Sequence, residues 1–410
     1  MLFYDVKTVE QTKQIMKDTV FPIGDIISVS LDEAFGYIVA EDIVAKENVP
    51  SFARSTVDGY AVCAKDTYGS SESMPSFLTI THEIEMGEEV TIPLHRGEAM
   101  YIPTGGMVPS GCDSIIMVEH CENIDGLLNT YKQVAPGENI ISVGEDVKET
   151  DIIIKKGSRI RAQELGILGA VGTRFVSVYR KLKVGYLSSG DEIMPYDTKH
   201  LQIGQVRDIN ALTITALTKE WGANVIYGGI VSDNYESFFS KAKELFDQVD
   251  LLVLSGGSSV GTKDYTTDVI QALGSPGVLV NGVSVKPGKP TIFGVAHKKP
   301  VLGLPGHPAS AVIIYKLFGD LLLQRLNGSR ERELPTEIKA TITQNLPSSP
   351  GRSDYIRVRL EKQEEKWIAY PVLGKSGLIS TLVDSDGVVE IPSEKEGITE
   401  GEIASVYLFR

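Results

Sequence analysis

Three turns that lie close together in the chain carry the residue types that bind phosphate. They cover residues 255–264, 286–290 and 304–308, and each contains glycine. The first and third follow apolar, strand-like runs and precede helix-like segments, so backbone N–H groups and a helix N-terminus would face the same edge of a sheet. The sequence therefore predicts a phosphorylated ligand at the edge of an α/β domain.

The first turn combines glycines with hydroxyl side chains. Glycine permits positive φ and leaves no side chain between backbone and phosphate, while hydroxyls can donate to phosphate oxygens. Its order matches neither GxxxxGK[ST] nor GxGxxG, so a plain βα turn is the alternative for this segment alone. The predicted ligand residues of this turn are Ser255, Gly256, Gly257, Ser258 and Gly261.

The second turn combines two lysines with two prolines. Two prolines restrain this loop and hold both ammonium groups together, which lowers the entropy lost when they bind an anion. A solvated surface turn is the alternative, but the neighbouring turns favour anion binding. The predicted ligand residues of the second and third turns are Lys286, Gly288, Lys289, Pro305, Gly306 and His307.

Acidic residues follow three predicted strands of the same domain. The segment 188–192 contains Ser188, Gly190, Asp191 and Glu192, and Asp233 and Asp264 follow two later strands. Helix N-capping explains any one of these carboxylates alone. Together, at the carboxyl ends of neighbouring strands and beside bound phosphate, they predict a divalent cation, with Asp264 and Glu192 as ligands.

Alternating strands and helices predict the α/β domain that would position these turns, at residues 179–327. Such alternation indicates right-handed βαβ units and a mainly parallel sheet, which binds ligands outside the carboxyl ends of its strands. The predicted strands are 182–187, 224–229, 249–254 and 301–304, and the predicted helices are 210–221, 235–246, 264–273 and 308–326.

The rest of the chain predicts three further regions of an α/β multidomain protein. Amphipathic spacing indicates helices in 1–45 and again in 148–178, which would form one discontinuous helical linker domain. Short apolar runs between Gly, Pro and Asn make 46–147 an inserted β-rich domain. Alternating patterns in 328–410 predict a C-terminal β-barrel.

Composition limits the class of protein. The 410 residues are 42% hydrophobic and 23% charged, as in globular proteins, and they carry a net charge of −14. Nucleic acids and acidic membranes are unfavourable partners for such a chain. Three scattered cysteines predict partly buried thiols rather than a disulfide framework. Because no long apolar run and no signal-like start appear, we expect a cytoplasmic protein.

Three polar turns in the β-rich region carry residues of the same kinds. They contain Asp58, Thr104 and Asp146. Each is by itself consistent with an Asx-capped turn. They acquire a functional meaning only if this region folds over a ligand site.

The ordered motifs of the chain resemble the MoeA family of molybdopterin molybdenumtransferases, which is related to the C-terminal domain of gephyrin. The resemblance covers nearly the whole chain. The matching segments are 55–61, 103–105, 144–146, 188–192, 204–208, 255–261, 286–290 and 304–308. The resemblance implies a MogA-like α/β domain and two substrates, adenylylated molybdopterin and molybdate, with release of AMP and dependence on Mg²⁺.

The resemblance also implies an elongated homodimer whose active cleft is shared between subunits. Asp58, Thr104 and Asp146 would close it from across the dimer as catalytic residues. Glu192, Asp233 and Asp264 would be the catalytic acids of the α/β side, and the lysines would hold anionic oxygens. It further suggests a MogA-type adenylyltransferase as a partner.

Two other interpretations share this fold. A pterin-binding scaffold or carrier would not need the acidic and lysine positions, and a MogA-like adenylyltransferase would not need the β domains. The sequence departs from the family pattern at His307, where Asn is common. A helix N-terminus disfavours charged histidine, so we expect a neutral hydrogen-bonding substitute there.

Overall fold

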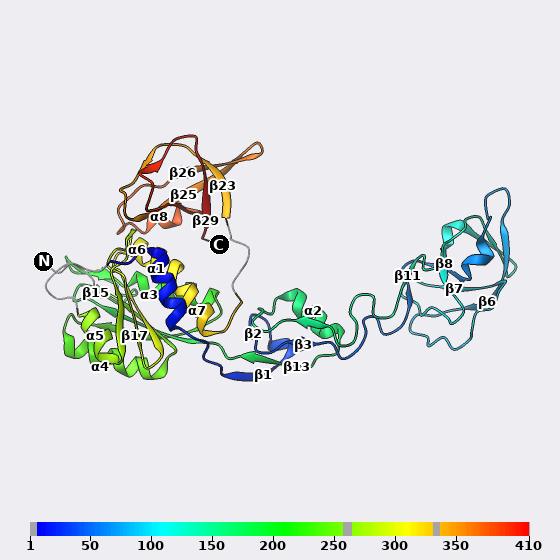
Figure 1. Cartoon of the computed structure of the whole chain (residues 1–410), viewed down its shortest axis with the longest axis horizontal. Helices are drawn as coiled ribbons and strands as arrows, with labels where there is room; N and C mark the ends of the chain where they lie inside the picture. Colours follow the sequence, from blue (N-terminus) through cyan, green and yellow to red (C-terminus); the bar gives the residue numbers. More distant parts are fainter. Residues whose placement is uncertain (1–5, 257–264, 331–336, 410) are drawn as a thin grey trace.

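The computed structural model describes residues 6–256, 265–330 and 337–409. Figure 1 shows an elongated molecule, with the α/β and C-terminal domains side by side at one end. The inserted β domain lies at the opposite end, and the linker region runs between them. The two ends of the molecule are therefore separated by the whole length of the linker.

A six-stranded mixed sheet forms the centre of the α/β domain, and it confirms the predicted mainly parallel sheet. Its first four strands run parallel, and the last two are antiparallel additions. In spatial order the strands are β17 (Asn224–Val231), β14 (Lys183–Ser189), β18 (Leu251–Ser255), β22 (Lys299–Leu304), β21 (Ile292–Ala296) and β19 (Pro276–Asn281). All side chains of β18 are buried, as expected for a strand covered on both faces.

Helices occur where the helical spacing predicts them. Asp208 and Asn234 cap the helices that begin at Ile209 and Tyr235 through side-chain oxygens. Pro308 is the first residue of the helix that follows the third glycine turn. The predicted helix 308–326 contains a π-helical turn, η4 (Tyr315–Gly319). The helices are α3 (Ile209–Glu220), α4 (Tyr235–Gln248), α5 (Thr266–Leu273), α6 (Pro308–Ile314) and α7 (Asp320–Leu326).

The helical prediction for the N-terminal segment is wrong beyond its first helix. Helix α1 (Val9–Thr19) forms, but its buried Val9 and Met16 join the core of the α/β domain rather than a linker. The residues that follow form β1 (Ile26–Ser30), where β-branched side chains favour a strand. Residues 31–37, which also have helical spacing, form only a short 3-10 turn, η1 (Leu31–Glu33).

The linker region is consequently mixed rather than helical. β13 pairs with β1 and β2, β12 pairs with β3, and a single α-helix, α2, covers them among the described linker residues. Their bounds are β2 (Ile38–Val39), β3 (Ile43–Val44), β12 (Ile152–Ile154), α2 (Ala162–Ala170) and β13 (Phe175–Tyr179). Strands from both ends of the discontinuous region pair with each other, which explains why it forms one unit.

The inserted domain is a β structure, as the short apolar runs predict. Its main sheet has the order β8 (Ser114–Met117), β5 (Gly59–Val62), β7 (Glu98–Ile102), β6 (Ser76–Glu83), β10 (Leu127–Thr130) and β9 (Cys121–Ile124). β4 (Arg54–Ser55) pairs with β11 (Ile140–Ile141) beside it, and two 3-10 turns, η2 (Ala64–Thr67) and η3 (Val118–His120), connect strands. Fully buried Met100 and Ile116 lie in its two core clusters.

The C-terminal domain is a closed five-stranded barrel, which confirms that prediction. The ring is closed because β25 pairs with β26 and β27. Its strands are β23 (Glu337–Ile342), β25 (Ser353–Gln363), β26 (Lys366–Pro371), β27 (Gly387–Ile391) and β29 (Ile403–Leu408); smaller elements are β24 (Leu346–Pro347), α8 (Ser380–Val383) and β28 (Gly397–Ile398). β20 (Val285–Lys286), from the second glycine turn, adds parallel to β25 and joins the barrel to the α/β domain.

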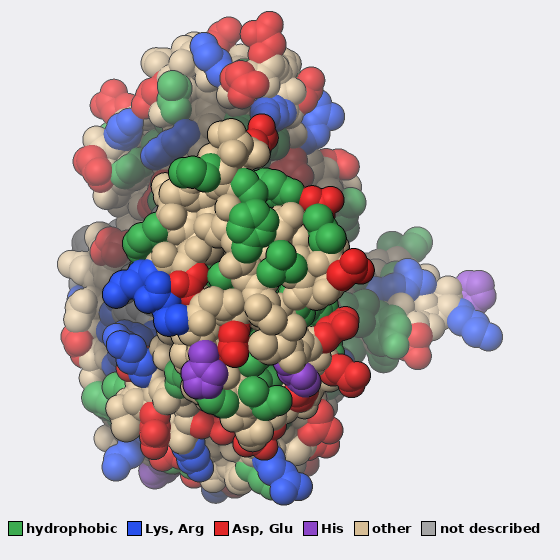
Figure 2. All heavy atoms as spheres, turned by 90° about the vertical axis from the view of Figure 1, so that its right-hand side faces the viewer, with side chains coloured by type: hydrophobic (Ala, Val, Ile, Leu, Met, Phe, Trp, Pro, Cys, Tyr) green, Lys and Arg blue, Asp and Glu red, His purple; other side chains and the backbone are tan. Residues whose placement is uncertain are grey.

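Among the described residues, no helix is long and apolar enough to cross a membrane. Figure 2 shows acidic and basic side chains interspersed over the face it presents. The cysteines are unpaired and partly buried, as predicted, and burial raises the pKa of the Cys112 thiol to about 11.

Candidate functional site

A large cleft lies where the α/β and C-terminal domains meet, with a volume of about 1670 Å³. The carboxyl ends of β14, β18 and β22 form one wall, as the topology of a parallel sheet predicts. Loops of the C-terminal barrel form the other wall. All three glycine turns contribute described residues to this lining, so the structure brings them together.

The end of β14 presents two serines whose hydroxyl groups are fixed by carboxylates. Ser188 Oγ donates to Asp208 Oδ2 at 2.6 Å, and Ser189 Oγ donates to Asp233 Oδ1 at 2.8 Å. Both serines are almost fully buried. Both serines line the cleft, and because their protons are used within the protein, their hydroxyl oxygens can act toward a ligand only as acceptors.

Asp208 is the organising carboxylate of this wall, and the sequence reasoning did not select it as a site residue. It is 4% exposed and accepts from Ser188, from the Tyr227 hydroxyl at 3.0 Å and from the Ala211 N–H at 3.0 Å. Burial, with Asp208 as a further cause, raises the pKa of Tyr227. The available signal was its place directly before a predicted helix, where a cap is expected.

Three predicted acids gather around the loop after β14. The Asp233 N–H donates to Asp191 Oδ1 at 3.1 Å, which ties the loops after β14 and β17 together. Glu192 and Asp233 line the cleft, whereas Asp191 does not. The structure thus assigns Asp191 a loop-holding contact and leaves the other two carboxylates facing the ligand space.

The predicted metal site is only partly described. Asp264 lies outside the described residues, and so do Gly257, Ser258 and Gly261 of the first turn. Within the described ranges, no group of three or more His, Cys, Asp or Glu side chains could hold a metal ion. Glu192 and Asp233 nevertheless supply carboxylate oxygens from two strand ends, the donor type that Mg²⁺ prefers.

Glycine is required where the first turn begins. Gly256 has φ of 107°, and a Cβ atom there would collide with the carbonyl oxygen of Ser189. The backbones after β14 and β18 therefore approach each other directly, and buried Ser255 sits beside this contact. A glycine in this turn lets two strand ends face the cleft together.

The second turn places its lysines at the opening of the cleft. Lys286 and Lys289 are both exposed and line the cleft. Lys286 Nζ lies 3.6 Å from Asp354 Oδ2. The other oxygen of this carboxylate, Oδ1, accepts from Arg352 Nε at 2.9 Å. Two cations thus share one buried carboxylate, and the local charge stays positive. Gly288 is buried against Ile314, where a Cβ atom would collide.

The third turn is engaged by the protein itself. Gly306 O accepts from Asn210 Nδ2 at 2.8 Å, and the ring nitrogen Nδ1 of His307 lies 3.0 Å from Ser376 Oγ of the C-terminal domain. The Ala309 N–H, at the start of α6, donates to Ser376 O at 3.1 Å. Pro305, Gly306 and His307 line the cleft as predicted, but this helix end also holds the neighbouring domain.

In the inserted domain, Asp58 and Thr104 form a preorganised pair. Asp58 Oδ1 accepts from the Thr104 N–H at 2.7 Å and from the Thr104 hydroxyl at 2.9 Å. These two hydrogen bonds, the backbone one first, lower the pKa of Asp58. Gly59 packs against β8, where a Cβ atom would collide with Ile116 O. Asp146 lies in a separate turn, where its N–H donates to Val49 O at 3.1 Å.

These predicted site residues of the inserted domain lie far from the cleft of the same chain. Asp58, Thr104 and Asp146 are exposed, and they are absent from the described cleft lining. Their domain occupies the opposite end of the elongated molecule (Figure 1). One chain therefore carries two separate sets of the predicted site residues.

Three family models match consecutive parts of the chain. They are the MoeA N-terminal region (domain I and II) at 7–172, a probable molybdopterin binding domain at 185–325 and the MoeA C-terminal region (domain IV) at 339–409. The molybdopterin molybdenumtransferase of Haemophilus influenzae is 34% identical over 93% of either chain. That of Bacillus subtilis is 31% identical over 94% of this chain and 90% of its own.

A solved structure has the same architecture. The molybdopterin biosynthesis MoeA protein of Pyrococcus horikoshii OT3 superposes with a TM-score of 0.86 at 28% identity. The match covers 99% of this chain and 100% of that one. The arrangement of domains is therefore shared along the full length.

Proposed function

Because the chain belongs to the MoeA family, we propose that it is a molybdopterin molybdenumtransferase that inserts molybdate into the dithiolene of adenylylated molybdopterin and releases AMP. The observation that carries the proposal is the cleft, which is lined by the lysines of the second glycine turn and by serines and carboxylates at strand ends of the sheet. Both substrates are anions, and this combination of donors and acceptors suits them.

Lys286 and Lys289 bind the anionic oxygens in this mechanism. Their ammonium groups lie on one restrained turn at the cleft, so little conformational freedom is lost when an oxyanion binds. Lys286 already shares Asp354 with Arg352, which holds its chain near the cleft wall. Lys289 remains exposed and is the more available of the two for ligand.

Glu192 and Asp233 are the described residues that fit a Mg²⁺ ion, with Asp264 as a further predicted ligand. Mg²⁺, when bound, neutralises phosphate charge and polarises the phosphoanhydride. Asp233 also holds Ser189, and Asp208 holds Ser188, so the acceptor atoms of the wall stay oriented during the reaction. Such preorganisation avoids rearrangement at the moment of reaction.

We further propose a homodimer in which the partner's Asp58, the partner's Thr104 and the partner's Asp146 complete the cleft. Support comes from the Asp58–Thr104 pair, which is built and exposed but lies far from the cleft of its own chain. In this arrangement the partner's Asp58 stays ionised and accepts or orients a proton during hydrolysis of the adenylyl group.

The protein is proposed to act in the cytoplasm, with a MogA-type adenylyltransferase supplying the adenylylated substrate. The interpretation as a MogA-like enzyme itself is set aside, because the family models match the regions on both sides of the molybdopterin-binding domain. The carrier interpretation keeps the same fold and is separated by experiment.

The test is to incubate the purified protein with adenylylated molybdopterin, Mg²⁺ and molybdate and to measure AMP. Release of AMP that requires molybdate supports the transferase. Tight binding of the adenylylated pterin without AMP release would contradict it and leave the carrier. Omission of Mg²⁺ should abolish release while binding persists.

A further inference from the structure

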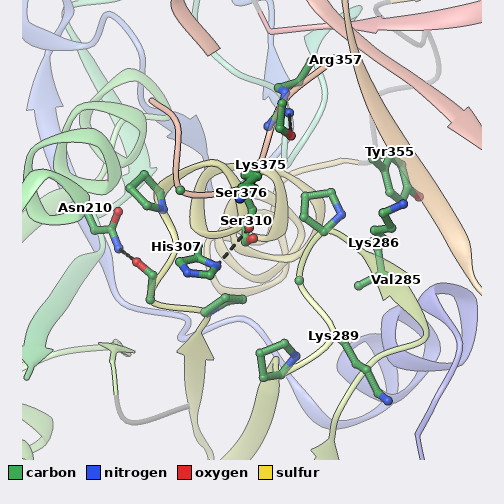
Figure 3. Close-up of a pocket in the computed structure, with 18 of the residues that line it drawn as sticks. Asn210, Val285, Lys286, Lys289, His307, Ser310, Tyr355, Arg357, Lys375 and Ser376 are labelled. Atoms are coloured by element: carbon green, nitrogen blue, oxygen red, sulfur yellow. Dashed lines mark hydrogen bonds between the residues drawn. The ribbon is translucent and has the colours of Figure 1, made fainter. Parts of the chain in front are cut away.

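A loop of the C-terminal barrel is tied to both walls of the cleft. This bridging loop, residues 372–377, follows β26. On the barrel side, the Val372 N–H donates to Arg357 O at 2.8 Å, and Arg357 Nη2 donates to Gly374 O at 2.8 Å. On the α/β side, Ser376 contacts His307 and Ala309. Each anchor thus comes from a different domain, as Figure 3 shows for Arg357 and His307.

Arg357 is a costly residue to have in this position. It is 7% exposed, and its Nε atom is buried with no hydrogen-bond partner among the described residues. Burial also lowers the pKa of its guanidinium. Among the residues that the structure describes, its guanidinium forms no ion pair, and a buried cation without a paired carboxylate destabilises a protein. Its side-chain contact with Gly374 O points to the bridging loop.

The bridging loop carries a lysine into the cleft. Lys375 lies between the two anchored residues, Gly374 and Ser376, and it is exposed and lines the cleft. Figure 3 places it beside Ser376, on the side of the C-terminal domain. Lys286 and Lys289 reach the same cleft from the second glycine turn. The cleft therefore has ammonium groups on two domains.

We propose that Lys375 is a further anion-binding residue of the cleft, and that Arg357 and His307 are positioning residues that act on it through the bridging loop. The ligand chemistry is an oxyanion, from molybdate or from the adenylyl phosphate, and in this respect the inference rests on the proposed function. The two anchors hold the bridging loop, and loss of either one frees Lys375 to move away from the ligand. Attraction between an ammonium group and an oxyanion weakens with distance, so affinity should fall.

The first experiment measures binding without turnover. Isothermal titration calorimetry with inorganic molybdate and, separately, with AMP distinguishes the two sources of the oxyanion. Lys375→Ala should weaken binding of one of these ligands by about tenfold or more, as expected for loss of a hydrogen bond to a charged group. Lys366→Ala removes an exposed lysine of the same barrel, outside the cleft lining, and should change neither affinity.

The second experiment asks whether the anchors act through Lys375. His307→Ala and Arg357→Gln should weaken the same ligand in the wild-type background, yet add little when Lys375 is already alanine. His307→Asn keeps a hydrogen-bonding side chain and should retain affinity. Because His307 is exposed, its variants test the coupling even if Arg357→Gln unfolds the barrel.

Each outcome bears on one claim. Unchanged affinities for both ligands in Lys375→Ala would overturn the inference, and so would equal losses from His307→Ala in the presence and absence of Lys375. Failure of the unmodified protein to bind either ligand would overturn it as well. Absence of AMP release by a protein that binds both ligands would contradict the proposed function alone.

Discussion

The predicted site residues of the α/β domain and those of the inserted domain are organised in opposite ways. In the α/β domain, side chains from three strand ends and from the C-terminal barrel surround one cleft. In the inserted domain, the Asp58–Thr104 pair is equally ordered, but it lies on an exposed turn at the far end of the molecule. Local order and a complete site are therefore separate properties, and in the proposed homodimer the second set would meet the cleft of the partner chain.

The largest expected effect tests that division. Asp58→Ala should lower the rate of AMP release by about 10²- to 10⁴-fold, the range for loss of a general acid or base, while ligand affinity stays near the wild-type value. The measurement is single-turnover AMP release beside calorimetric binding of AMP. If Asp58→Ala lowered ligand affinity as much as it lowered the rate of AMP release, a catalytic role for Asp58 would be contradicted.

A mixing experiment sharpens the same comparison. If the cleft is shared, Asp58→Ala and Glu192→Ala chains that exchange subunits should recover about a quarter of wild-type activity, because half of the dimers then contain one intact cleft. The control is each variant alone, carried through the same exchange. No recovery, with heterodimers demonstrated by mass spectrometry, would contradict a cleft shared in this way.

Glycine substitutions should separate structure from ligand contact within the α/β wall. Gly256→Ala forces a Cβ atom against Ser189 O at positive φ and should reduce unfolding free energy by about 2–4 kcal/mol. Gly306→Ala has no heavy atom within 4 Å of its new Cβ and should fold normally. Thermal unfolding of both variants tests this, and equal stability would show that the two strand ends can separate.

Lysine substitution should affect binding more than chemistry. Lys289→Ala should weaken molybdate or AMP binding by about tenfold, since a charge-assisted hydrogen bond is lost at an exposed position. Single-turnover release at saturating ligand should then approach the wild-type rate. A reduced rate at saturation, with unchanged affinity, would instead place Lys289 among the catalytic groups.

The smallest effect concerns the pH dependence of the Asp58 turn. Hydrogen bonds from Thr104 lower the pKa of Asp58 in the folded protein, so these contacts stabilise the fold above the unfolded-state pKa and are lost as pH falls through the folded-state pKa. Thr104→Val keeps the backbone bond, which is the larger cause, and should raise this pKa slightly. NMR titration of the Asp58 carboxyl measures the shift, and a fall would contradict the assignment.

Prediction from sequence succeeded where neighbouring residues carry the information. The apolar strands before the glycine turns and the helices α3 and α4 are encoded locally, and the structure confirms them. The linker was less predictable, because β1 and β13 are stable only when paired across an insertion of more than a hundred residues. Amphipathic spacing in such short segments did not distinguish helix from strand.

Some site residues were also beyond local reasoning. Asp208 was not selected from the sequence, because only the fold shows that Ser188 and Tyr227 converge on it. Similarly, residues 374–377 resemble a family loop only weakly, and neither Arg357 nor Lys375 was selected from the sequence; both line the cleft because the barrel packs there, with β20 paired to β25. The positions of such residues depend on how two domains pack.

The sequence by itself determined the kinds of element and the chemistry that each turn carries, since turn geometry, capping and strand patterning depend on adjacent residues. Tertiary structure alone decided which of these groups share a space. It placed β14 between β17 and β18, docked the bridging loop on His307 and left Asp58 at the far end. Contacts between distant segments depend on strand order and domain packing, which no local pattern specifies.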